Sequence, residues 1–452
     1  MTLTLLGLGP GNPGHRTAEA NRSLESATRI LLRTSIHPGL EDLVCDPKVS
    51  TCDDLYQSGW SFRDVYEAII ERVLAQAADG DLVFAVPGHP LIGESTTRAI
   101  LSRAAELGIQ TRVVTGVSAL DVLATALHLD LMADEVQILD ATELQEWIEQ
   151  EPFTGSLPDF SPLRPVLLTQ VYSQPVASAV KLALARIYPN HHRLVVARAG
   201  GVPGAEVLEQ RALFELDRGS VDHLTSVWVP PLAELEATRH PLTLHRIAAR
   251  LRAPGGCPWD RKQTHASLHD SAIEEAYEVA DAIDAGEPDH LAEELGDLAL
   301  QVAMHAQIAE EEGMFSIGDV FDQVNRKLIR RHPHVFGTSD AETPDAVVKT
   351  WNQIKAQERA ERGEPQSDRV MSPYDRLPRS MPVARRVAKC TTIVAGSDAT
   401  GEQVAKMGDE LLRIVQTLAR AGNDPEYELE HAYRRQFEQE MAQPMSSPAT
   451  QR

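Results

Sequence analysis

The sequence predicts a multidomain protein in which an N-terminal α/β domain precedes an all-α helical region. The chain has 452 residues, more than a single hydrophobic core usually holds. Its first 235 residues alternate short apolar runs with amphipathic helical stretches, as α/β domains do. Beyond residue 242, β-branched runs give way to stretches rich in Ala, Leu and Glu with helical period, which indicates helices packed on one another.

Composition narrows the class of protein. Hydrophobic residues make up 42% of the chain and the formal net charge is -23, so it resembles an ordinary globular protein with an acidic surface. An excess of negative charge disfavours nonspecific binding to nucleic acids and membranes. The four cysteines show no metal-binding spacing, and no leader or long apolar run is present. We therefore expect a cytoplasmic protein without nucleic-acid or membrane partners.

Within the N-terminal domain, residues 1–235, five apolar runs predict strands: 3–9, 81–88, 111–116, 165–171 and 193–200. The first runs into a turn that contains Gly7, Gly9 and Gly11, where the missing side chains allow a ligand to approach the backbone. A tight connection between strand and helix explains the same glycines equally well.

The helical region, residues 242–362, divides into separate helices. Ser271 and Glu274 have capping-box spacing, which predicts a helix from Ser271 to Gly286. The next is expected from about Asp289 to Gly313, and others at 317–331 and 344–361. In the second helix, four apolar residues repeat along one face that we expect to be buried: Leu291, Leu295, Leu298 and Val302.

The remaining chain predicts a linker, a third segment and a tail. Residues 363–382 are rich in proline and charge, and 442–452 are expected to be disordered. Residues 383–441 echo the carboxylate-bearing helix, with Asp409 matching Asp297 but Lys406 standing in place of Glu294. This segment therefore reads as a degenerate copy that packs without binding the same cation.

Acidic residues dominate the first two helices of the helical region. From Gln263 to Asn325 the chain has 16 Asp and Glu and no Lys or Arg. A solvated acidic face explains an isolated Glu pair, but matched pairs on consecutive helices favour a shared cation.

Four carboxylates have the spacing for such a site. Glu275 and Glu278 are three residues apart on one predicted helix, and Glu294 and Asp297 repeat that spacing on the next. Two like charges about 4 Å apart cost on the order of 4 kcal/mol at an effective dielectric near 20, so a counter-ion is needed. Oxygen-only ligands predict Mg²⁺ or Mn²⁺.

A basic cluster follows. Lys327 and Arg331 lie one helical turn apart and suit phosphate oxygens, with Arg330 beside them. Trp351 and Lys355 are a turn apart on a later helix and fit a base and a further phosphate. Taken alone, a basic pair of this kind is more often a solvated helix edge, and a tryptophan at helical spacing is more often part of a core.

These residues closely resemble the MazG-type nucleoside triphosphate pyrophosphohydrolases, through five ordered blocks: 250–268, 274–278, 293–298, 327–337 and 351–358. The resemblance implies an all-α homodimer that splits nucleoside triphosphates into monophosphate and pyrophosphate with Mg²⁺, in a housecleaning role. It implies four metal ligands: Glu275, Glu278, Glu294 and Asp297. It places nucleotide or phosphate contacts at Lys327, Arg330, Arg331, Trp351, Lys355 and Trp259. Glu274, together with Lys327 and Arg331, is expected to serve catalysis, with Glu274 orienting or deprotonating water.

The N-terminal domain resembles the tetrapyrrole (corrin/porphyrin) methylases through 3–17, 86–95 and 113–127. The resemblance implies S-adenosylmethionine bound between two α/β lobes. The implied contacts are Gly7, Gly9, Pro10, Gly11, Gly88, His89, Pro90, Gly116, Val117 and Ser118. His89 stands where many active members have Asp, which speaks against methyl transfer.

Two alternatives to a pyrophosphohydrolase remain. One is an S-adenosylmethionine-dependent methyltransferase with a regulatory helical domain, and the other is a scaffold whose sites have decayed. The complete set of four carboxylates argues against the scaffold.

Overall fold

The computed structural model describes residues 1–56, 62–150, 157–339, 343–361, 381–384 and 401–442. The chain divides into two compact units, Met1–Val320 and Phe321–Arg452, and each is described by itself. None of the helices in the described part is both long and apolar enough to cross a lipid bilayer.

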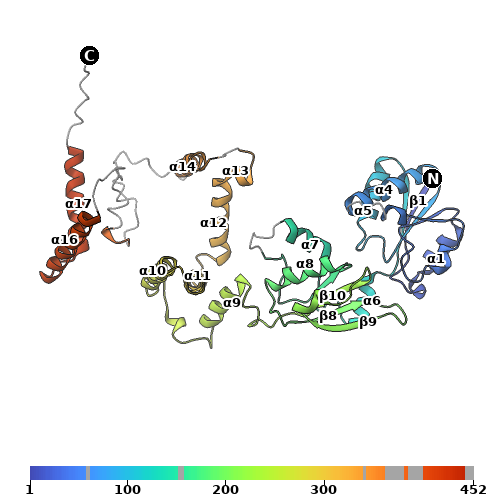
Figure 1. Ribbon diagram of the computed structural model, residues 1–452, viewed down its shortest axis with the longest axis horizontal. Coiled ribbons are helices and arrows are strands. Elements are labelled where there is room, and N and C mark those ends of the chain that lie inside the picture. Colours follow the sequence, from blue (N-terminus) through green and yellow to red (C-terminus); the bar gives the residue numbers. More distant parts are fainter. Residues whose placement is uncertain (57–61, 151–156, 340–342, 362–380, 385–400, 443–452) are drawn as a thin grey trace, which may run out of the picture. The chain divides into compact units, whose positions relative to one another are not determined.

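The first lobe is built on a parallel five-stranded sheet with the order β3-β2-β4-β1-β5. Its strands are β1 (Thr2–Gly7), β2 (Ile30–Leu32), β3 (Val49–Thr51), β4 (Leu82–Val86) and β5 (Gln110–Val114). Alternate residues of β4 enter two different cores, one beneath α4 (Phe62–Ala78) and α5 (Ser95–Glu106), the other beneath α1 (Ala18–Ser26) and α2 (Glu41–Val44). Helices therefore cover both faces of this sheet (Figure 1), so its central strand β4 is a continuous apolar run. The short helices η1 (Pro13–His15) and α3 (Asp53–Tyr56) lie in its loops.

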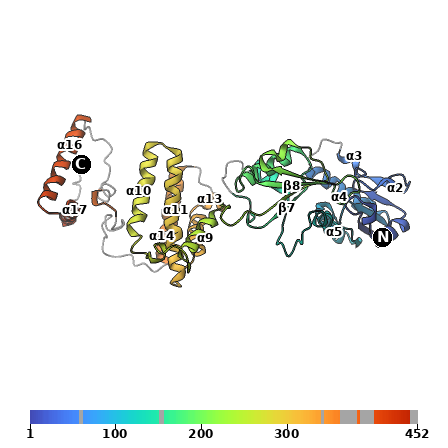
Figure 2. The ribbon, with the colours of Figure 1, turned by 90° about the horizontal axis from the view of Figure 1, so that it is seen from below.

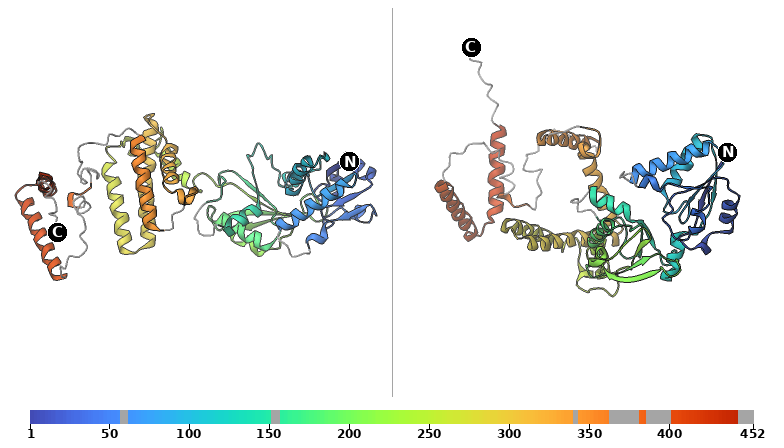
Figure 3. Two further views of the ribbon diagram at one scale, coloured as in Figure 1. Left: turned by 90° about the horizontal axis from the view of Figure 1, so that it is seen from above. Right: turned by 45° about the vertical axis from the view of Figure 1, so that its right-hand side comes forward.

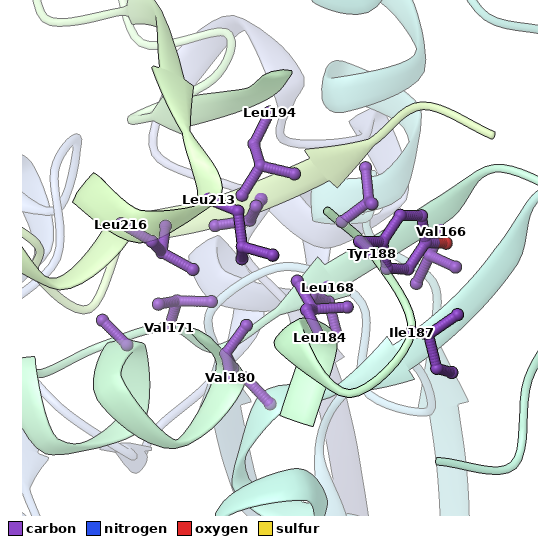
Figure 4. Packing of buried hydrophobic residues seen from close by; sticks show 14 of the residues in the cluster. Val166, Leu168, Val171, Val180, Leu184, Ile187, Tyr188, Leu194, Leu213 and Leu216 are labelled. Carbon is purple, nitrogen blue, oxygen red and sulfur yellow. The ribbon is translucent and has the colours of Figure 1, made fainter. Parts of the chain in front are cut away.

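The second lobe contains a mixed sheet with the order β6-β7-β10-β8-β9. Its strands are β6 (Gln137–Asp140), β7 (Val166–Thr169), β8 (Arg193–Arg198), β9 (Val207–Ala212) and β10 (Thr225–Val229). One face packs on α7 (Ala141–Gln150) and α8 (Gln174–Ala185) through the apolar cluster shown in Figure 4, and η2 (Leu213–Arg218) closes its edge. The intervening residues of the strands face α6 (Ala119–Leu127) on the other side.

All five expected strands are confirmed, as β1, β4, β5, β7 and β8. The other five were not predicted. The shortest of these, β2 and β3, have three residues each, too few for an alternating pattern to stand out.

The helical part of the first unit contains α9 (Pro241–Arg252), η3 (Asp260–Lys262), α10 (His269–Ala285) and α11 (Pro288–Glu311). Helix α10 begins at His269, so the predicted capping box at Ser271 is wrong, because Ser271 already lies inside the helix. The predicted end is confirmed, since Gly286 caps α10 in the left-handed region with φ of 69°. Figure 2 shows α10 and α11 side by side as a hairpin.

The expected buried face of α11 is also corrected. Leu295 is 50% exposed and Val302 is 45% exposed, and Leu291 and Leu298 are half-buried. The buried residues of α11 are instead Ala303, Met304 and Ile308. The buried residues pack against Ala248 of α9 and against the segment that precedes α10. The apolar repeat through Leu295 and Val302 therefore identifies a face that the single chain leaves open to solvent.

Among its described residues, the second unit has helices as its only regular elements. They are α12 (Ile317–Arg331), α13 (Pro333–Phe336), α14 (Pro344–Glu361), α16 (Gly401–Arg420) and α17 (Pro425–Ala442). Helix α12 begins just before the division between the two units. The helices expected at 317–331 and 344–361 are confirmed as α12 and α14. The predicted degenerate segment includes α16 and α17, drawn in red in Figure 3, while its residues 385–400 lie outside the described part. The predicted linker at 363–382 falls almost wholly outside it, as does the tail from residue 443.

Candidate active site

The α10–α11 hairpin positions the acidic residues. Its short turn follows from Gly286, which ends α10, and Pro288, which begins α11, because glycine tolerates positive φ and proline suits the first turn of a helix. The two helices contact each other along their length (Figure 2). Residues three or four apart on one helix share a face, so a pair on α10 can meet a pair on α11.

Three of the four predicted ligands are brought together. One carboxylate oxygen from each of Glu275, Glu278 and Glu294 lies within 4.8 Å of the others. The Glu294 side chain is only 12% exposed, while Glu278 is open to solvent. Asp297 lies one turn after Glu294, exposed and outside this group of three.

Electrostatics within the cluster favour a cation. Burial raises the pKa of Glu275, and the charges of Asp297, Glu278 and Glu294 raise it further, against a hydrogen bond from Gln301 that lowers it. The pKa is raised because the ionised form is disfavoured near like charges. A set of carboxylate oxygens without sulfur ligands fits Mg²⁺ or Mn²⁺. Glu274, beside Glu275 on α10, is exposed and is not part of the group.

His290 and Gln301 of α11 border the cluster and were not among the predicted site residues. The His290 imidazole Nε2 lies 2.9 Å from Glu294 Oε1. The Gln301 side-chain amide donates a hydrogen bond of 3.4 Å to Glu275 Oε1. Their spacing is the signal that was available, because residues 290, 294, 297 and 301 are four, three and four apart and so follow one helix face.

The predicted basic residues lie in the second unit, and two of them form ion pairs there. Arg330 and Arg331 both pair with the buried carboxylate of Glu358 on α14, with 2.7 Å between Arg330 and Glu358 Oε1. Arg331 is bonded to Glu358 through two of its nitrogens, and its Cζ lies 5.2 Å above the Trp351 ring. Lys327 is exposed on α12. Arg331 thus links α12 to α14 through its contact with Glu358.

The predicted nucleotide contacts differ in their surroundings. Trp351 is half-buried, with the His332 ring 5.0 Å away at 72°. Lys355 is also half-buried on α14. Trp259, at the start of η3, is 65% exposed.

In the N-terminal lobe, the structure brings the three predicted glycine segments together. Gly9 and Gly88 exchange two backbone hydrogen bonds of 3.1 and 2.8 Å. A Cβ on Gly7 would lie 2.5 Å from the Gly88 carbonyl oxygen and 2.7 Å from the Gly116 nitrogen. These glycines therefore allow backbone to pack on backbone at the carboxyl ends of β1, β4 and β5.

The other predicted contacts of this lobe lie in the same loops. Pro10, Gly11 and Pro90 are buried, and Val117 is half-buried. Ser118 caps α6 and forms a capping box with Asp121. The His89 side chain is held within its own loop, because its Nδ1 accepts a hydrogen bond of 3.0 Å from the Leu91 backbone N–H.

Family comparisons agree with both halves of the chain. Residues 2–216 match the model of the tetrapyrrole (corrin/porphyrin) methylases, and residues 263–336 match the MazG nucleotide pyrophosphohydrolase domain. The first of these ranges includes the first lobe and all of the second lobe's strands except β10, and the second includes α10, α11 and α12.

Similar proteins match most of the chain or one part of it. An uncharacterized protein of Bacillus subtilis, YabN, is 37% identical over 390 residues, which cover 86% of this chain and 76% of YabN. The nucleoside triphosphate pyrophosphohydrolase/pyrophosphatase MazG of Thermotoga maritima is 50% identical over 141 residues, 31% of this chain and 52% of that protein. Among solved structures, uroporphyrin-III-C-methyltransferase from Thermus thermophilus is 21% identical, with a TM-score of 0.39, covering 51% of this chain and 94% of that one.

Proposed function

Because this chain belongs to the family of tetrapyrrole methylase and MazG fusion proteins that includes Bacillus subtilis YabN, we propose that its helical region hydrolyses nucleoside triphosphates. The observation that carries the proposal is the convergence of Glu275, Glu278 and Glu294 within 4.8 Å. Their position in the segment matched by the MazG domain supports it.

The proposed reaction breaks the anhydride bond between the α and β phosphates. The oxygen of one water forms a bond to the α phosphorus. The bond between that phosphorus and the bridging oxygen breaks, and the bridging oxygen keeps the electron pair and leaves as part of pyrophosphate. The products are a nucleoside monophosphate and pyrophosphate, and the water gives up its proton. Removal of damaged or surplus nucleotides from the cellular pool is the role that fits this reaction.

We propose that Glu275, Glu278, Glu294 and Asp297 hold Mg²⁺, or Mn²⁺ in its place. A bound divalent cation offsets phosphate charge and acidifies water. The protein contributes the orientation of these four carboxylates on a rigid hairpin. Glu274, exposed beside Glu275, is the proposed acceptor of the water proton.

The phosphate contacts are proposed from the surroundings of each basic side chain. Lys327 is exposed and can reach a ligand without losing a described ion pair. Arg330 keeps 54% of its side chain exposed and is the second candidate. Arg331 is bonded to Glu358 and stacked on Trp351, so we assign it the task of holding these groups in place. Trp351, Lys355 and Trp259 remain proposed nucleotide contacts.

A homodimer through the helical region is part of the proposal. Tyr277, Ile283, Leu295 and Val302 leave 40% to 58% of their surfaces exposed on α10 and α11. Apolar side chains gathered in this way on one hairpin are typical of a covered interface. Light scattering should report a dimer, and Val302→Asp should shift it toward monomer. A wild-type monomer at every concentration would rule the interface out.

For the N-terminal half, the methylase family match favours S-adenosylmethionine as ligand. This is the alternative function, a methyltransferase with a regulatory helical domain. Calorimetry with S-adenosylmethionine tests it directly, and absence of binding would count against it. The same calorimetry on His89→Asp, which introduces the residue found in many active members of the methylase family, serves as the comparison with the wild type.

The decisive test measures pyrophosphate release from a panel of canonical and oxidised nucleoside triphosphates, with and without Mg²⁺. Glu275→Gln should lose the release, whereas Glu293→Gln, an exposed neighbour outside the carboxylate group, should keep it. No release from any nucleotide by the wild type would refute the proposed hydrolase.

A further inference from the structure

One face of α11 carries more than the two predicted ligands. His290, Glu294, Asp297 and Gln301 succeed one another at intervals of four, three and four residues, which keeps them on a single helical stripe. The two carboxylates lie in the middle, with His290 at one end and Gln301 at the other. His290 contacts Glu294 of the same stripe, and Gln301 contacts Glu275 on α10.

The contact at the N-terminal end is close. Nε2 of His290 lies 2.9 Å from Oε1 of Glu294, an N–O distance in the range of an ion pair. The other ring nitrogen, Nδ1, is 3.6 Å from Glu287, which is beyond hydrogen-bond range. His290 therefore holds one oxygen of Glu294, whose side chain is 12% exposed and has little freedom to turn.

The contact at the other end acts across the hairpin. Gln301 on α11 donates through Nε2 to Glu275 on α10, at 3.4 Å. Reversing the amide would point its oxygen at a carboxylate, so the donor assignment is the favourable one. The Gln301 Oε1 atom is buried and has no hydrogen-bond partner among the described residues. A buried acceptor without a partner costs stability, which is consistent with a residue placed for the site and not for the fold.

We propose that His290 and Gln301 are positioning residues that orient Glu294 and Glu275 for cation binding. The inference rests on the proposed function, because it concerns the same carboxylate cluster. Its physical basis is that a carboxylate already aimed by a hydrogen bond loses less freedom when it binds a metal ion. Both residues act through the carboxylates and have no assigned contact with the nucleotide.

The test is calorimetric titration of the full-length protein with MnCl₂ and with MgCl₂, without nucleotide. His290→Ala and Gln301→Leu should each weaken cation binding by about 10- to 100-fold. His290→Gln, whose amide can still donate to Glu294, should recover part of the loss, and Gln301→Asn, whose donor is one methylene shorter, should not.

Matched controls are available on the same two helices. Gln307 donates to Glu311 at 3.2 Å, and His269 lies 2.7 Å from Asp270, both outside the cluster. Gln307→Leu and His269→Ala remove equivalent contacts and should leave cation affinity within about twofold of the wild type, since outer contacts matter only next to a ligand.

The outcomes separate the two proposals. If the wild type binds neither cation, the metal-dependent function fails. If it binds and the His290 and Gln301 variants bind equally well, the positioning role is refuted while the function stands. At saturating cation, His290→Ala should regain the wild-type kcat and keep the wild-type KM for nucleotide. A raised KM for nucleotide under these conditions would also refute the role.

Discussion

Replacing Glu275 by Gln should have opposite effects on stability in the absence and presence of a divalent cation. Two carboxylate charges 4.8 Å apart repel each other by about 3.5 kcal/mol at an effective dielectric near 20. Glu275 has two such neighbours in the cluster, and water around exposed Glu278 screens part of this repulsion. We therefore expect the neutral side chain to stabilise the cation-free hairpin by about 1–3 kcal/mol.

With cation present the order should reverse. A cation at one hundred times its dissociation constant stabilises the wild type by about 2.7 kcal/mol, and the variant, lacking one ligand, should gain much less. The assay is hydrogen exchange of α10 and α11 amides at pH 8, with and without Mn²⁺. Glu293→Gln removes an exposed charge from the same hairpin and should change neither value appreciably. A Glu275→Gln hairpin that is less protected than wild type without cation, or that responds equally to Mn²⁺, would refute the electrostatic reasoning.

Three further predictions address the rest of the chain. Glu358→Ala leaves two arginines without their buried partner, so exchange of α14 amides should accelerate, and unchanged protection would contradict that role. Burial, and secondarily His265, lowers the pKa of His305, so protonating this residue is less favourable in the folded state than in the unfolded state. Hydrogen-exchange protection of α11, corrected for intrinsic exchange, should therefore fall as the pH drops below about 6.5, the ordinary pKa of histidine. Equal protection at pH 7.5 and 5.5 would contradict this. Gly7→Ala places a Cβ 2.5 Å from a carbonyl oxygen and should destabilise the N-terminal lobe by about 1–3 kcal/mol in denaturant titration, whereas Gly200→Ala, with a contact of 3.4 Å, should be tolerated.

Strands and helices with strong local patterns were predictable from the sequence. Strand β4 is a continuous apolar run because helices cover both faces of its sheet. The end of α10 followed from Gly286, and the pairing of Glu275 with Glu278 followed from helical spacing. The start of α10 was missed because Ser271 and Glu274 share the spacing of a capping box but lie within the helix.

Contacts between distant residues could not be read in the same way. Arg331 has the spacing of a phosphate ligand, yet its guanidinium is bonded to Glu358, 27 residues away. The repeat through Leu295 and Val302 has the period of a buried stripe, although the single chain packs α11 on α9 through other residues. Periodicity tells which side chains share a face, but it carries no information on which partner meets that face.

The local sequence therefore determines which chemical groups this protein offers: the carboxylate pairs, the glycine turns and the residues that end helices. Their use depends on packing, which placed His290 and Gln301 beside the carboxylates and filled the glycine positions of the N-terminal lobe with neighbouring backbone. The reason is physical, since backbone conformation responds to adjacent residues, whereas hydrogen bonds and burial depend on atoms that folding brings together from far apart in the chain.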